Sequence, residues 1–103
     1  MRLTEAEARA ILQAVRKTCG EGARVRLFGS RLDPNKRGGD IDLLVELPKP
    51  PGDNPWWLAA RIAAAIQIAL GEERKVDVIL DWPGAPSHPV RDAARRTGRA
   101  LGR

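Results

Sequence analysis

Residues Phe28 to Leu47 read FGSRLDPNKRGGDIDLLVEL, which joins a Gly-Ser pair, a short basic loop and an Asp-Ile-Asp triplet that opens an apolar run. Side chains alternate between the two faces of a strand, so residues two apart point the same way, about 7 Å apart. We therefore expect Asp40 and Asp42 on one face. Two carboxylates held this close repel each other unless a proton or a cation intervenes. The stretch predicts a site for a divalent cation.

Mg²⁺ is the cation that suits such a site, because it prefers hard oxygen ligands and is usually held by one or two carboxylates together with substrate phosphates. Phosphoryl-transfer sites often contain two metal ions about 4 Å apart. A third carboxylate is then expected nearby. The strand-like run KVDVIL, from Lys75 to Leu80, offers Asp77 between two valines. The predicted metal ligands are Asp40, Asp42 and Asp77.

The Gly-Ser pair predicts an anion-binding turn. It follows ARVRLF, residues Ala23 to Phe28, which reads as a strand, and a turn from a strand into another element exposes backbone N–H groups that bind anions. Gly29 lets the backbone approach a phosphate without an intervening Cβ, and the Ser30 hydroxyl can donate to a phosphate oxygen. Arg31 and further basic residues add positive charge along the loop.

Taken together, these residues resemble the hallmark of the minimal nucleotidyltransferases (MNT) of the DNA polymerase β-like superfamily, in which Gly-Ser, a short spacer and Asp-x-Asp follow one another. The matches are Gly29-Ser30, Asp40-Ile41-Asp42 and the later Asp77, and with the elements between them they cover nearly all of the chain. Nine residues, Arg31 to Gly39, separate Ser30 from Asp40, slightly fewer than is most common, and Gly38-Gly39 replaces the usual polar pair.

The resemblance implies an activity and a set of binding residues. An NTP, ATP in the first place, would be bound through Gly29, Ser30, Arg31 and Gly39. Two Mg²⁺ ions would be held by the catalytic residues Asp40, Asp42 and Asp77. The reaction would transfer a nucleoside monophosphate to an acceptor hydroxyl.

The resemblance also implies a partner. Many members are antitoxins paired with an all-helical HEPN toxin that is encoded beside them, and some adenylylate a tyrosine of that toxin. Two alternatives remain. One is an inert binding subunit that neutralises a toxin by complex formation, and the other is a nucleotidyltransferase that modifies small molecules such as aminoglycosides.

Length and composition limit these choices. At 103 residues the chain is expected to form one domain, residues 1–103, too short to include a separate acceptor domain. The acceptor is then expected on a partner chain or in a homo-oligomer. No apolar run of about 18 residues and no signal peptide are evident, so we expect a cytoplasmic protein without a membrane segment.

The fold expected from the pattern is α/β (α+β), a nucleotidyltransferase fold with a small mixed β-sheet of three or more strands and three to four helices. Thr4 and Glu7 form a capping box, and Gly20 ends that helix. Asn54 and Pro55 begin a second helix that runs to Leu70. The remaining expected elements are strands over 23–28, 40–47 and 75–80, and a last helix over 89–99 that Ser87 caps.

Two surface features have alternative interpretations. The second helix is apolar nearly all round, so either part of it meets another chain or alanines fill an ordinary exposed face. The segment 91–103 has five arginines and one aspartate and so carries four of the five net positive charges. It could contact phosphates or an acidic partner, or be a solvated helix. The chain has no Tyr and one Phe, so direct nucleic-acid binding is not favoured.

Overall fold

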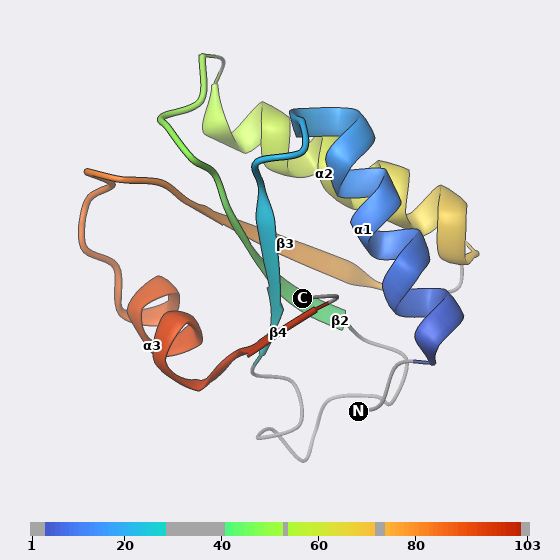
Figure 1. Ribbon diagram of the computed structural model, residues 1–103. Helices are drawn as coiled ribbons and strands as arrows, with labels where there is room; N and C mark the ends of the chain where they lie inside the picture. Colours follow the sequence, from blue (N-terminus) through green and yellow to red (C-terminus); the bar gives the residue numbers. More distant parts are fainter. Residues whose placement is uncertain (1–3, 29–40, 53, 72–73, 102–103) are drawn as a thin grey trace.

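The computed structural model describes residues 4–28, 41–52, 54–71 and 74–101, and it shows a mixed sheet with helices on both faces (Figure 1). The expected α/β (α+β) class is confirmed. Along the chain the elements are α1 (Glu5–Cys19), β1 (Arg24–Leu27), β2 (Ile41–Glu46), α2 (Pro55–Leu70), β3 (Val76–Asp81), α3 (Pro89–Thr97) and β4 (Arg99–Ala100). None of the helices in these ranges is long and apolar enough to cross a membrane.

The four strands form one sheet in the order β3-β2-β1-β4. β2 and β3 are parallel and are connected through α2, as parallel neighbours require a crossover. β1 is antiparallel to both β2 and β4. The long strands β2 and β3 therefore run side by side, with β3 at one edge of the sheet.

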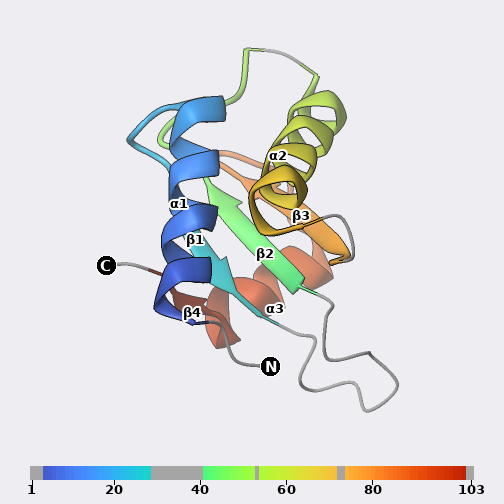
Figure 2. The ribbon, with the colours of Figure 1, turned by 90° about the vertical axis from the view of Figure 1, so that its right-hand side faces the viewer.

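The hydrophobic core lies between the sheet and the pair of helices α1 and α2 (Figure 2). Alternate residues of β2, namely Ile41, Leu43 and Val45, are completely buried there, and Ile62 and Ile66 of α2 cover them. Helix α3 lies on the opposite face of the sheet (Figure 1). The first five residues of β2 are all buried, so β2 is a central strand that is covered on both faces.

Helix α1 begins and ends as expected. Thr4 accepts a hydrogen bond from the Glu7 N–H at 3.0 Å, and Glu7 accepts one from the Thr4 N–H at 2.9 Å. Gly20, with φ of 94°, ends the helix, in a conformation that glycine adopts without strain. Cys19 is half-buried at the last position of the helix, and burial raises the pKa of its thiol.

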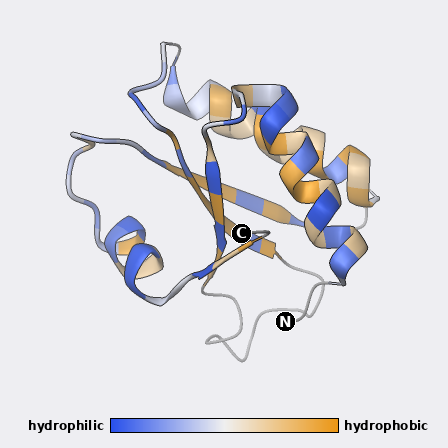
Figure 3. Cartoon of the chain, in the orientation of Figure 1, coloured by the Kyte–Doolittle hydropathy of each residue, from blue (hydrophilic) through white to orange (hydrophobic). Residues whose placement is uncertain are grey.

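Helix α2 also has the expected limits, with Asn54 as its N-cap and Gly71 after its last residue. Figure 3 shows that apolar residues extend over most of its surface. Ala60 and Ala64 are exposed, which agrees with an ordinary exposed face filled by alanines. Trp56, Trp57 and Ile68 are exposed as well, which agrees with a contact surface for another chain. Both features therefore occur on the same helix.

The C-terminal part differs from the expectation in two respects. His88, rather than Ser87, is the N-cap of α3, because its Nδ1 accepts hydrogen bonds from the N–H groups of Val90 and Arg91. The Ser87 hydroxyl instead donates to Asp92. The helix ends at Thr97 rather than at residue 99, because Arg99 and Ala100 pair with β1 as β4.

A solvated surface is the wrong description for part of the arginine-rich segment. Arg95 binds the buried carboxylate of Asp81 through two nitrogens, at 2.6 and 3.1 Å. Arg91 donates to the carbonyl oxygens of Leu80 and Pro86. These contacts attach α3 to the end of β3, although the Arg95 side chain is still 50% exposed. Arg96 and Arg99 are exposed as well.

Replacing Arg95 by Met should lower the stability of the fold, because Asp81 is only 5% exposed and would lose its closest cation. Arg96→Met is the matched control, since Arg96 is an exposed arginine of the same helix. In urea unfolding followed by circular dichroism, the Arg95 variant should have the lower midpoint. Equal midpoints for the two variants would contradict this role of Arg95.

Glu7 should make stability dependent on pH. Hydrogen bonding from the Thr4 backbone, and secondly from Arg74 at 2.7 Å, lowers the pKa of Glu7 below its ordinary value of 4.5. A lowered pKa contributes stability above the pKa of the unfolded chain, and this contribution is lost as the pH falls through the folded-state pKa.

Glu7→Gln should therefore unfold at lower urea concentration than the parent at pH 7. The difference should shrink as the pH falls below about 4.5, where the unfolded chain begins to bind the proton. Glu5→Gln, at another acidic position of the first turn, serves as the control. A difference between Glu7→Gln and the parent that is independent of pH would refute the assignment.

Candidate carboxylate site on strands β2 and β3

Asp42 and Asp77 face each other across the two parallel strands. They are Cα partners in the β2–β3 register, in which Ile41 is opposite Val76 and Leu43 is opposite Val78. Neighbouring strands lie about 4.8 Å apart, and partners in register point to the same face of the sheet. Two carboxylates from sequence positions 35 apart are thus brought together.

Both aspartates lie on the α3 side of the sheet. The residues that flank each aspartate along its strand, such as Ile41, Leu43 and Val76, belong to the core under α1 and α2. Because side chains alternate between the faces of a strand, Asp42 and Asp77 point to the other side of the sheet. The two carboxylates differ in environment: Asp42 is 7% exposed, whereas Asp77 is exposed. The pair therefore has one sheltered member and one that solvent or a ligand can reach.

A second carboxylate pair lies on the same face, farther along the same strands. Glu46 and Asp81 are also Cα partners. Arg26 binds Glu46 at 3.1 Å, and Arg95 binds Asp81, so arginines neutralise this pair from within the fold. We assign it a structural role. Sequence reasoning did not single out Asp81, because its arginine partner is supplied by a helix that follows later in the chain.

The donor set of Asp42 and Asp77 fits a divalent ion such as Mg²⁺. Two carboxylates in register supply hard oxygen ligands, and Mg²⁺ is typically bound by one or two carboxylates with waters and substrate phosphates completing the shell. No group of three or more His, Cys, Asp or Glu side chains that could hold a metal ion occurs in the described part of the chain. The described site is therefore a two-carboxylate site.

Five predicted site residues lie outside the described residues: Gly29, Ser30, Arg31, Gly39 and Asp40. The strands on either side of this segment are described, however. Phe28, just before it, donates its N–H to the Asp42 carbonyl at 3.0 Å, and Ile41, just after it, donates to the Lys75 carbonyl at 2.8 Å. The two described residues that flank this segment, Phe28 and Ile41, are therefore held beside the Asp42–Asp77 pair.

Lys75 is a residue near this site that the sequence analysis did not single out. It is exposed and lies two residues before Asp77, so strand alternation places it on the same side. Its carbonyl anchors Ile41 as described above. The signal in the sequence is the Lys-x-Asp spacing, which places a positive charge and a carboxylate on the same side of an extended chain.

Comparison with known proteins identifies the family. No curated protein matches the chain significantly. The family model described as nucleotidyltransferase domain matches residues 8–96, a span that begins in α1 and ends in α3 and includes both aspartates of the pair. Because this match covers most of the chain, and the fold agrees with it, the chain belongs to the nucleotidyltransferase domain family.

Proposed function

We propose that this protein is a Mg²⁺-dependent nucleotidyltransferase that transfers a nucleoside monophosphate, AMP from ATP in the first place, to an acceptor hydroxyl. The observation that carries the proposal is the in-register pair of Asp42 and Asp77 in a chain of this family. The pair supplies oxygen ligands for a divalent ion, and such an ion is typically bound by carboxylates together with substrate phosphates.

The aspartates and the basic and glycine-rich residues would have different tasks in this reaction. Asp42 and Asp77 would hold the divalent ions together with Asp40, and these ions would neutralise charge on the triphosphate. Lys75, exposed on the same side, adds a positive charge for the phosphates. Gly29, Ser30, Arg31 and Gly39 remain the proposed nucleotide-binding residues of the preceding segment.

The proposed transfer forms one bond to the α-phosphorus of the NTP and breaks another. The acceptor oxygen forms a bond to the α-phosphorus, the bond from the α-phosphorus to the bridging oxygen breaks, and pyrophosphate leaves with that electron pair. The proton of the acceptor hydroxyl goes to a base. Asp77 suits this last role because it is the exposed member of the carboxylate pair.

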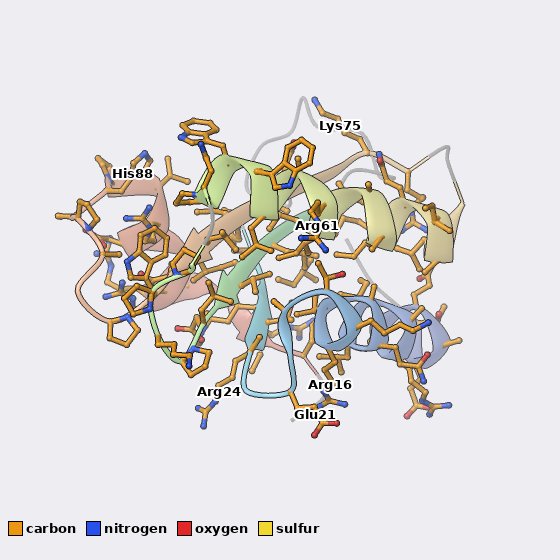
Figure 4. All side chains as sticks on the ribbon, turned by 90° about the horizontal axis from the view of Figure 1, so that it is seen from above. Arg16, Glu21, Arg24, Arg61, Lys75 and His88 are labelled. Carbon is orange, nitrogen blue, oxygen red and sulfur yellow. The ribbon has the colours of Figure 1, made fainter. Side chains whose placement is uncertain are left out.

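We further propose that the acceptor is a hydroxyl of a protein partner, such as a HEPN-type toxin in the cytoplasm, for which this chain acts as antitoxin. An exposed face of α2, on the side next to α1, supports a protein partner (Figure 4). Trp57, Arg61, Ala64 and Ile68 recur at i, i+4, i+7 and i+11, and all four are exposed. Figure 4 shows Arg61 on the side of α2 that faces α1.

The same face supports a second candidate function, an inert subunit that neutralises its partner by complex formation. Trp57 is 62% exposed and Ile68 is 79% exposed. Large apolar side chains this exposed are typical of protein contact surfaces. The two candidates differ in whether protection of the cell requires the carboxylates of the sheet or only the face of α2.

Asp42→Asn should abolish Mg²⁺-dependent ATP binding and nucleotidyl transfer, with at least about a hundredfold loss, because a ligand charge is removed while the shape is kept. Glu46→Gln is the matched control. Glu46 lies on the same strand and the same face, but Arg26 neutralises it. Calorimetric titration with ATP in the presence of Mg²⁺ measures both variants. Unchanged binding by Asp42→Asn would exclude the proposed site.

Protection of cells from the toxin distinguishes a catalytic antitoxin from an inert binding subunit. When each variant is expressed together with the proposed HEPN-type toxin, Asp42→Asn should fail to protect if transfer is required. Trp57→Ser should fail in either case, because it removes an exposed apolar anchor. Full protection by Asp42→Asn together with failure of Trp57→Ser would show that the protein acts as an inert binding subunit.

A further inference from the structure

A groove lies beside β3, close to the candidate carboxylate site. It has a volume of about 450 Å³ and is lined by residues of α2, of β3, and of the segment that connects β3 to the first turn of α3. Trp56 of α2, Ile79 of β3, Trp82 and His88 are among them. The volume lies in the range of about 300–1,000 Å³ that is usual for ligand pockets.

The wall of the groove at Trp82 is held in place by contacts within the chain. The Arg91 guanidinium lies 5.6 Å from the centre of the Trp82 ring. Arg91 also donates to the carbonyl oxygens of Leu80, at 2.9 Å, and Pro86, which fixes the segment on both sides of Trp82. This wall is therefore formed before a ligand binds, which lowers the cost of ordering it.

The opposite wall contains Trp56, at the start of α2. Its side chain is 86% exposed, and exposed large apolar side chains of this kind are typical of binding surfaces. Aromatic rings pack favourably against one another in offset-stacked or edge-to-face arrangements. With a tryptophan on each wall, the groove suits an aromatic side chain.

The groove is continuous with the candidate site along β3. Ile79 lines the groove and follows Asp77 by two residues, so both side chains point to the same face of the sheet, about 7 Å apart. On the other side of the pair, Phe28 donates to the Asp42 carbonyl from the side of β1. The predicted nucleotide-binding segment is thus joined to the sheet beside Asp42, whereas the groove lies on the side of Asp77.

His88 gives the groove a polar group. Its Nδ1 accepts a hydrogen bond from the Val90 N–H at 3.2 Å, so Nε2 carries the proton of the neutral ring and can donate to a peptide carbonyl. Figure 4 shows His88 well apart from Arg61. The groove is therefore distinct from the face of α2 that contains Arg61 and Trp57.

We propose that this groove binds the acceptor segment of the protein partner. The hydroxyl-bearing residue of an extended segment reaches Asp77, and an aromatic residue two positions away enters the groove between Trp56 and Trp82. Residues two apart in an extended segment point the same way at about 7 Å, which is the spacing of Asp77 and Ile79. This assignment rests on the proposed transferase function and adds to it the residues that select the acceptor.

Titration of the ¹⁵N-labelled protein with two capped peptides tests the groove in the absence of nucleotide. Phe-Ala-Ser-Ala-Phe has an aromatic residue two positions from the hydroxyl on either side, and Ala-Ala-Ser-Ala-Ala has none. The first peptide should shift the amide signals of Val78 and Leu80 and the indole signal of Trp82. It should bind at least about tenfold more tightly than the second, as expected for an aromatic anchor.

Trp56→Ala should remove this preference for the aromatic peptide. Trp57→Ala is the matched control, because Trp57 is also exposed but does not line the groove, and this variant should keep the preference. Equal binding of the two peptides to the parent, or equal effects of the two substitutions, would overturn the proposal.

ATP binding distinguishes failure of this proposal from failure of the transferase function. In calorimetric titration with ATP and Mg²⁺, Trp56→Ala should bind ATP as tightly as the parent, because the groove holds the acceptor. Weakened ATP binding by Trp56→Ala would place the nucleotide in the groove and overturn the assignment. A parent that binds the aromatic peptide but not ATP would contradict the transferase function, while the peptide site would stand.

Discussion

The parallel pairing of β2 with β3 is the constraint on which the rest of the molecule depends. Its register places Asp42 opposite Asp77 and Glu46 opposite Asp81, while the residues between them enter the core under α1 and α2. The same alternation decides which backbone groups of β3 remain at the sheet edge. A shift of one residue would bury the carboxylates and expose the core, so the hydrophobic core and the candidate site fix the register together.

One face of the sheet has two carboxylate pairs, of which one stabilises the fold and the other is the candidate site. At one end, Arg26 and Arg95 balance Glu46 and Asp81 and hold α3 against the sheet. At the other end, the pair of Asp42 and Asp77 lies beside Phe28 and Ile41, which are hydrogen-bonded to Asp42 and Lys75. The α3 attachment thus gives rigidity to the strands that position the proposed metal ligands.

Local signals in the sequence predicted the helices well, because caps and glycine stops act within a few residues. The Thr4–Glu7 capping box and the Asn54 N-cap are examples. β4 and the Arg95–Asp81 pair were not predicted, since both depend on contacts between distant segments, and His88 is not a usual cap residue. For the site, the register places Asp77 beside Asp42, as the sequence analysis expected. The metal-binding roles of these two residues stay predictions, as do the roles of Gly29, Ser30, Arg31, Gly39 and Asp40.

Paramagnetic broadening by Mn²⁺ in the ¹⁵N-labelled protein tests the central claim, that the Asp42–Asp77 pair is a divalent-cation site. Mn²⁺ takes the same oxygen ligands as Mg²⁺ and broadens nearby amide signals. The account predicts that the signals of Asp42 and Asp77 disappear first, that those of Glu46 and Asp81 persist, and that Asp42→Asn removes the effect. Broadening centred on Glu46 and Asp81, or no localised broadening, would contradict it.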